Sequence, residues 1–156
     1  MKAALVVGLL LLLSGCGSRT VHAVAPCEGS QLRASQGPVA VGLGNRLEEV
    51  VFTNVSSRAC LLRGHPTITA GGRPVNVLRG NNDGTYFGRL VPAMLKPGEH
   101  AFLDFATANG TDCGGRRYHD LVFTLPQGGR VRARQVTITE HCSLTISALG
   151  RPERPG

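Results

Sequence analysis

The sequence contains no tryptophan, and aromatic residues make up only 4% of it. Proteins that bind single-stranded nucleic acid without sequence preference need aromatic side chains on which bases stack. Carbohydrate-binding modules use the same rings to stack on sugars. The scarcity of these rings argues against both classes of protein, and we expect no nucleic-acid partner.

Lysine is nearly absent as well. Lys2 and Lys96 are the only two lysines, so almost all the positive charge in a chain of formal net charge +7 is arginine. Two explanations stay open, because GC-rich genomes favour arginine codons and because a basic surface could face anionic lipid headgroups or polymers. Composition alone does not choose between them.

Long apolar runs are confined to the N-terminus. Residues 3–13 form an unbroken apolar run after Met1-Lys2. A membrane-spanning helix needs about 20 apolar residues, whereas the core of a signal peptide needs about 7–15. The run therefore predicts an export signal.

The residues that follow this run indicate the type of signal. Leu13-Ser14-Gly15-Cys16 resembles the bacterial lipobox, in which a leucine and two small residues precede the cysteine that becomes the mature N-terminus. It predicts removal of residues 1–15 as a lipoprotein signal peptide and acylation of Cys16, palmitate included. Because two acyl chains hold stably to a bilayer, we expect a lipid-anchored protein on the outer face of the cell membrane. The alternative is an ordinary signal peptide cut after residues 23–25.

The rest of the chain divides into three parts. Residues 16–26 are expected to form the lipidated N-terminus and a tether, because 17–26 show neither helical nor strand periodicity. Ten extended residues reach at most about 35 Å, which keeps the domain near the membrane. Residues 27–149 are expected to form one β-sandwich domain, and residues 150–156 a disordered tail.

Acylation of Cys16 would leave four cysteines, Cys27, Cys60, Cys113 and Cys142. An even number of cysteines in an exported chain predicts disulfides, here two, and three pairings are open. We favour Cys27–Cys60 and Cys113–Cys142, because each bond then closes within one half of the domain. No two cysteines form a C-x-x-C motif, which disfavours a metal site or a redox pair.

Glycines and prolines interrupt the chain at the frequency typical of a β-protein. The 21 glycines and nine prolines separate short runs rich in Val, Thr, Leu and Phe. No segment shows a sustained period of 3.6 residues. The candidate strands are residues 31–34, 46–54, 66–70, 75–78, 87–91, 100–107, 118–125, 130–139 and 143–149. Their spacing predicts an all-β fold, a two-sheet antiparallel β-sandwich of the immunoglobulin-like kind, stapled by the disulfides.

One of these strands shows a change of phase. In residues 130–139 the apolar residues before Arg134 stand at odd positions and those after it at even positions. In one regular strand the two sets would therefore point to opposite faces. One inserted residue inverts the side-chain register of a strand, so we predict a β-bulge at residues 134–135.

A series of short motifs occurs in order along the chain. They are Cys27-Glu28-Gly29-Ser30, Phe52-Thr53-Asn54 with Ser56 and Cys60, Leu62-x-Gly64-His65-Pro66, Gly71-Gly72, Leu95-Lys96-Pro97-Gly98, Cys113, Leu125-Pro126 and Cys142. In order and spacing they resemble an exported actinobacterial domain, domain-of-unknown-function family 4232, over about residues 27–149. The resemblance implies a β-sandwich with paired cysteines and assigns no activity. His65 departs from the pattern, since members often carry an aromatic residue there.

Signatures of catalysis are scarce. The chain lacks the G-x-S-x-G, S-x-x-K, H-E-x-x-H and P-loop patterns. His100, His119 and His141 would form a metal site only if adjacent strands brought them together, and scattered surface histidines are the simpler explanation. We assign no catalytic, cofactor-binding or metal-binding residue and expect no enzyme. An envelope hydrolase or metal-dependent enzyme with an unrecognised site is the alternative.

Three arginines form the most distinctive surface pattern. Arg130, Arg132 and Arg134 alternate along one strand and so share a face, and Arg116-Arg117 are expected nearby. Such a face could bind anionic phospholipid, a teichoic-type polymer or an acidic protein, although a solvated edge strand also needs charge. The sequence thus predicts a membrane-anchored lipoprotein whose non-catalytic domain binds a protein or an anionic polymer at the cell envelope.

Overall fold

The computed structural model describes residues 23–80, 87–108 and 113–153. The predicted signal peptide, Cys16 and most of the predicted tether lie outside this part of the chain. Within it, no helix is long and apolar enough to cross a membrane, and the one helical segment is a single 3-10 turn, η1 (Gly29–Gln31).

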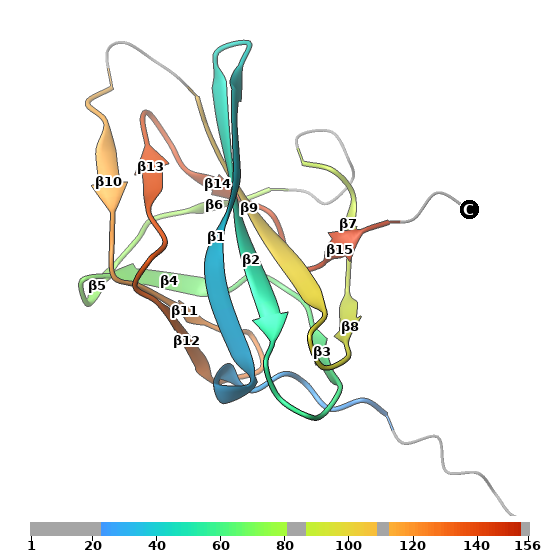
Figure 1. The fold of residues 1–156 in the computed structure, drawn as a ribbon. Helices are drawn as coiled ribbons and strands as arrows, with labels where there is room; N and C mark the ends of the chain where they lie inside the picture. Colours follow the sequence, from blue (N-terminus) through green and yellow to red (C-terminus); the bar gives the residue numbers. More distant parts are fainter. Residues whose placement is uncertain (1–22, 81–86, 109–112, 154–156) are drawn as a thin grey trace, which may run out of the picture.

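Two larger sheets make up most of the fold (Figure 1). The five-stranded sheet has the order β1 (Leu32–Gly42), β2 (Asn45–Asn54), β9 (His100–Ala108), β14 (Thr145–Ile146) and β6 (Leu78–Arg79). The four-stranded sheet has the order β12 (Arg130–Ala133), β11 (Leu121–Thr124), β4 (Thr67–Ala70) and β5 (Arg73–Pro74). Apart from the parallel pair β14–β6, these neighbours run antiparallel.

Three two-stranded antiparallel pairs complete the described chain. They are β3 (Cys60–Leu62) with β8 (Ala93–Leu95), β7 (Leu90–Val91) with β15 (Arg151–Pro152), and β10 (Arg116–Tyr118) with β13 (Ile138–Glu140). The all-β class and the antiparallel, sandwich-like arrangement predicted from the sequence are therefore confirmed.

The core lies between the two larger sheets, where three phenylalanine rings meet. Phe123 of β11 packs edge to face against Phe52 of β2 and Phe105 of β9, with ring centroids 5.2 and 6.4 Å apart. All three side chains are at most 1% exposed. The period-2 alternation of β2, β9 and β11 sends one set of side chains inward, and the opposite set forms the outer faces.

The hairpin of β1 and β2 is longer than the sequence predicted and extends beyond the sandwich (Figure 1). Residues 35–42 were not expected to be strand, because Gly37-Pro38 normally ends one. In the structure the register shifts between Gln36 and Val39, which takes Gly37 and Pro38 out of the regular ladder. Pairing with β2 then continues to the turn at Leu43-Gly44.

Two predicted strands are each divided in the structure. Residues 118–125 separate into β10 and β11, with Asp120 in the left-handed region at φ 50°. Residues 130–139 separate into β12 and β13, with a turn at 134–135 in which the Val136 N–H donates to the Ala133 carbonyl. The predicted bulge is therefore wrong, because the chain leaves one sheet and joins another. A change of sheet also inverts which side chains face the core, which explains the change of phase.

The predicted disordered tail is wrong for its first four residues. Gly150 exchanges backbone hydrogen bonds with Phe102 at 2.7 and 3.1 Å, and β15 pairs with β7. The Glu153 N–H donates to the Arg89 carbonyl at 3.0 Å. This end of the chain closes one edge of the fold despite its proline and glycine content.

Both predicted disulfides are confirmed. Cys27 is bonded to Cys60 and Cys113 to Cys142, with Cα–Cα distances of 4.7 and 4.8 Å. The first bond is buried in the core and fixes the start of the domain to β3. The second is partly exposed and joins the segments that flank β10 and β13.

Candidate functional site

The predicted arginine face lines a hollow of about 820 Å³ on the outside of the four-stranded sheet. Arg130 and Arg132 belong to β12, and Arg134 lies in the turn that follows. The other lining residues come from β11, from β4, from the turn after β4 and from the bend before β11. They are Val122, Thr124, Thr69, Gly71, Gly72 and Asp120.

Strand register explains why these side chains meet. Val122 of β11 lies between Arg132 of β12 and Thr69 of β4, since it pairs with both. Directly opposed residues in antiparallel strands point to the same face, and neighbouring strands lie about 4.8 Å apart. The three side chains thus form one row across the floor of the hollow.

Among the described residues, the arginines of the hollow form no ion pair. All three are exposed, and in the described residues the ion pairs join other groups, Arg46–Glu48, Arg89–Glu153 and Arg151–Glu99. Asp120 is the one carboxylate among the lining residues. Arg130 and Arg132 are two positions apart on one strand, which sets their Cα atoms about 6.7 Å apart.

This arrangement suits phosphate-bearing anions. A guanidinium presents five N–H donors in a planar fork that matches two oxygens of a phosphate, and it is more weakly hydrated than an ammonium. The hydroxyls of Thr69 and Thr124 are further hydrogen-bonding groups on the same surface. An anion bound there would also relieve the repulsion among the three positive charges.

The hollow adjoins the point where the chain enters the domain. Arg130 also lines a second hollow, of about 550 Å³, together with residues 25–30 and 127–129. The backbones touch here, because a Cβ on Gly29 would lie 2.2 Å from the Arg130 carbonyl oxygen. A Cβ on Gly129, which has φ 85°, would lie 2.6 Å from the Gly29 nitrogen. The root of the predicted tether and the start of the arginine row are thus fixed to each other.

The other candidate residues of the sequence analysis lie apart. Arg116 and Arg117 are on β10, in a different sheet, and neither lines the hollow. His100 Nδ1 lies 2.9 Å from Thr53 Oγ1, and His119 Nδ1 lies 3.1 Å from Thr137 Oγ1. The backbone N–H of His141 donates to the hydroxyl of Thr107. Across the described ranges, no three His, Cys, Asp or Glu side chains group closely enough to hold a metal ion.

The acidic candidates are equally dispersed. Glu140 accepts a hydrogen bond from the Tyr118 hydroxyl, and Asp120 is at the arginine hollow. Asp104 faces Glu49 across β9 and β2, on the outside of the five-stranded sheet, in a pocket of about 210 Å³. Burial raises the pKa of Asp104, and burial together with the charge of Asp104 raises the pKa of Glu49. Both pKa shifts favour the protonated carboxyls, which lie on the outside of the five-stranded sheet, away from the arginine hollow.

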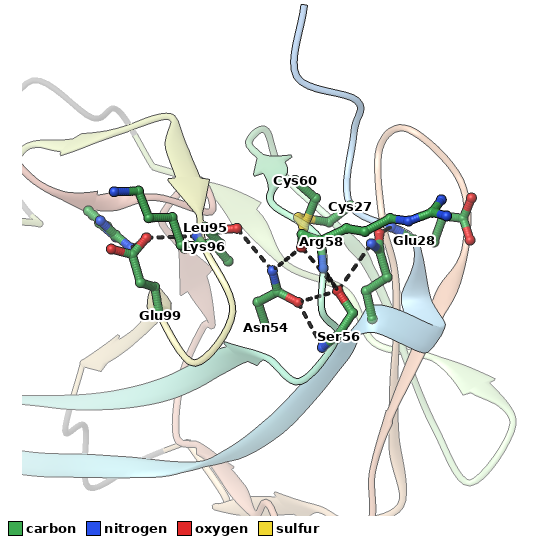
Figure 2. Close-up of a disulfide and its surroundings, with 11 residues drawn as sticks. Cys27, Glu28, Asn54, Ser56, Arg58, Cys60, Leu95, Lys96 and Glu99 are labelled. Atoms are coloured by element: carbon green, nitrogen blue, oxygen red, sulfur yellow. Dashed lines mark hydrogen bonds and ion pairs between the residues drawn. A yellow bond between two sulfur atoms is a disulfide. The ribbon is translucent and has the colours of Figure 1, made fainter.

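Several motif residues turn out to hold loops together rather than to line a site. The buried amide of Asn54 donates to the carbonyls of Arg58 and Leu95 at 2.7 and 2.9 Å, and it accepts from Ser56 (Figure 2). Next to it, the Glu99 carboxylate accepts the Lys96 N–H at 2.7 Å. These contacts join the segment before β3 to the turn between β8 and β9.

Residues 27–149 match the model of one protein family, Domain of unknown function (DUF4232). The chain belongs to this family. No curated protein and no solved structure gives a significant match. The family match covers both disulfides, the Asn54 network and the arginine hollow, so all three lie within the family's domain.

The two threonines that line the hollow, Thr69 and Thr124, were not predicted as site residues. The alternation of β11 puts Thr124 on its outer face, but nothing in the sequence of β11 brings Thr69 beside it. That neighbourhood arises because β11 pairs with β4, a strand far away in the sequence. No local pattern encodes such a pairing.

Proposed function

We propose that this chain is an exported lipoprotein, anchored by acylated Cys16 to the outer face of the cell membrane. Its non-catalytic domain binds phosphate-bearing anions of the envelope through the arginine hollow. The observation that carries the proposal is that three exposed arginines, which form no ion pair within the described part of the chain, line one hollow beside the tether root.

The anchoring part of the proposal rests on the lipobox at residues 13–16 and on the disulfides. Two bonded cysteine pairs fit an oxidising compartment outside the cytoplasm. The Cys27–Cys60 bond also suits a tethered domain, because it fastens the first residues after the tether into the core.

The binding part rests on position as well as charge. An anchor at Cys16 and a tether of residues 17–26 hold the domain within about 35 Å of the headgroups. Arg130 lies at the root of that tether. Each basic residue near an anionic surface contributes about 1 kcal/mol, so three arginines together contribute about 3 kcal/mol.

The test compares the full chain carrying Cys16→Ser with the same chain in which Arg130, Arg132 and Arg134 are glutamine. Binding is measured to vesicles rich in phosphatidylglycerol, to zwitterionic vesicles and to soluble polyphosphate. We expect the triple change to weaken binding to the anionic probes about 100-fold, because 1.4 kcal/mol corresponds to a factor of ten. Preference for vesicles over polyphosphate would identify the lipid as the source of the phosphate.

A matched control removes the same charge elsewhere. Arg33, Arg79 and Arg117 are exposed and lie on β1, β6 and β10, away from the hollow. Changing these three to glutamine is expected to leave most of the affinity intact. Equal losses for the two triple variants would show that net charge, and not the hollow, drives binding, and would refute the proposed site.

A further inference from the structure

The distal part of β1 carries exposed apolar side chains that the proposed function leaves unexplained. Val39, Val41 and Leu43 are 45%, 64% and 103% exposed. Leu47, which pairs with Ala40 and so lies on the other face of the hairpin, is 40% exposed. No charged residue occurs from position 37 to position 45, although the chain carries a net charge of +7. This is the part of the hairpin that extends beyond the sandwich (Figure 1).

The outer edge of this segment also carries backbone groups without strand partners. β1 is the edge strand of the five-stranded sheet in the described chain. The turn at Leu43-Gly44 has two residues, so Gly42 and Asn45 form its hydrogen-bonded closing pair. Because such pairs alternate, Ala40 also bonds to β2, whereas the N–H and C=O groups of Val39 and Val41 point away from it.

The sequence on the two sides of Ala40 is nearly symmetric, so two antiparallel copies of the strand can place similar residues opposite each other. If two copies of β1 lay antiparallel about Ala40, Val39 would face Val41 of the second copy. Beyond this pair, Pro38 at the bulge would lie next to Gly42 of the second copy. The proline ring would then meet a residue without a side chain.

We propose that this edge pairs with the same edge of a second copy of the chain, about a twofold axis at Ala40. The outward N–H and C=O groups of Val39 and Val41 then bond to those of the other copy, and the two sheets become continuous. Val39 and Val41 of both copies gather on one face of the pair. β-branched cross-strand neighbours of this kind stabilise a ladder.

The position of Leu43 supports a second copy as the occupant. Leucine rarely adopts φ 48°, and turns of this type usually carry asparagine or glycine there. Within one copy the side chain contacts nothing that would repay this strain, since it is fully exposed. In the pair it lies at the end of the ladder, beside the Gly37-Pro38 bulge of the second copy.

The pairing surface is small, so we expect two copies to pair only where the protein is concentrated. A few apolar side chains fall short of the roughly 1,200–2,000 Å² that stable interfaces bury. Confinement by the proposed anchor raises the effective concentration and favours pairing at the membrane. Both tethers reach one bilayer when the paired strands lie along its plane. The strength of pairing thus rests on the proposed anchoring, while its register does not.

The test is cysteine cross-linking of the full chain in the membrane. Residue 40 of the two copies would form a non-hydrogen-bonded pair with Cα atoms about 4.5 Å apart, within the range of a disulfide. Ala40→Cys is therefore expected to give a covalent dimer on mild oxidation. Ser35→Cys is the control on the same exposed strand, because two copies of residue 35 would lie about 33 Å apart and should not cross-link.

A second variant tests the apolar contact. Val41→Asp in the Ala40→Cys background places charge beside the axis and is expected to lower the dimer yield about tenfold, with an unchanged melting temperature. The proposal is overturned if Ala40→Cys gives no dimer, if Ser35→Cys dimerises equally, or if Val41→Asp has no effect. Cross-linking of residue 40 to a different protein would also overturn it and would assign the edge to that partner. Fractionation of the same samples reports on the anchor separately.

Discussion

Asn54 shows how a single buried amide can organise a region with little regular structure. It is fully buried, and all of its polar atoms are paired, to Arg58, Leu95 and Ser56. Replacing it with alanine removes the side-chain donor of the Arg58 and Leu95 carbonyls and the acceptor of the Ser56 N–H and hydroxyl. We expect Asn54→Ala to lower the free energy of unfolding by about 1–3 kcal/mol, measured by chemical denaturation.

Asn45 provides the comparison for this prediction. It lies at the other end of β2, is only half-buried, and makes one long side-chain hydrogen bond, 3.3 Å, to the Leu43 carbonyl. Asn45→Ala is expected to change stability by no more than about 0.5 kcal/mol. Similar costs for the two variants would contradict the role assigned to the Asn54 network.

The carboxylates of Asp104 and Glu49 make stability depend on pH. Folding raises the pKa of both groups, by burial and, for Glu49, also by the charge of Asp104. The folded state therefore binds protons more tightly than the unfolded state, so this pair favours folding at acidic pH. That contribution is lost as the pH rises through the raised pKa values.

Replacing Asp104 with asparagine removes a carboxylate whose burial is unfavourable when it is charged, and it also removes the negative charge beside Glu49. We expect Asp104→Asn to raise the melting temperature at pH 7 by a few degrees, of the order that about 1 kcal/mol produces, and to have less effect near pH 4. Glu153→Gln, at an exposed ion pair, is the control and should show no such gain. A melting temperature that falls at pH 7 would contradict the assigned cause.

At the scale of the element, the two disulfides allow two contributions to stability, loop closure and packing in the core, to be compared. They close chain loops of similar length, 33 and 29 positions, so chain entropy predicts about 3–4 kcal/mol for each. Only Cys27–Cys60 is also packed in the core, at 2% and 1% exposure. We expect the Cys27→Ala, Cys60→Ala variant to lose more stability than the Cys113→Ala, Cys142→Ala variant, by denaturant titration. Equal losses would mean that loop closure alone sets the effect.

The strands differ in how far local sequence determines them. β2 and β9 lie within one residue of their predicted bounds, because the central strands alternate regularly between core and outer face. The distal half of β1 was missed because Gly37-Pro38 ends a strand unless a bulge and a long partner strand compensate. β3 and β8 are short, and they form through pairing with each other.

The candidate site shows the same division. Alternation alone predicts that Arg130, Arg132 and Arg134 share one surface, and in the structure all three line one hollow, Arg134 from the turn after β12. The sequence could not predict the other lining residues of the hollow, such as Thr69, because they depend on the pairing of β11 with β4. It also could not show that β12 ends before Arg134, because a change of sheet and a bulge produce the same change of parity.

At the scale of the whole molecule, the anchor and the arginine hollow would act as two attachments of different kinds. Acyl chains bind through burial of methylene groups, about 0.8 kcal/mol each, which salt does not weaken. The arginines bind through charge, which is screened over about 10 Å at 0.1 M salt. Because Arg130 lies at the tether root, both attachments would engage the same membrane.

This division predicts the fractionation of four forms of the protein. The unchanged chain and the Arg130, Arg132, Arg134 triple glutamine variant should both stay with the membrane at any salt concentration. Cys16→Ser should stay partly bound at low salt and be released by 0.5 M salt, because only the arginines hold it. Cys16→Ser combined with the triple change should be soluble throughout. If Cys16→Ser alone is soluble even at low salt, the hollow does not face the membrane, and an anionic ligand elsewhere in the envelope must account for its charge.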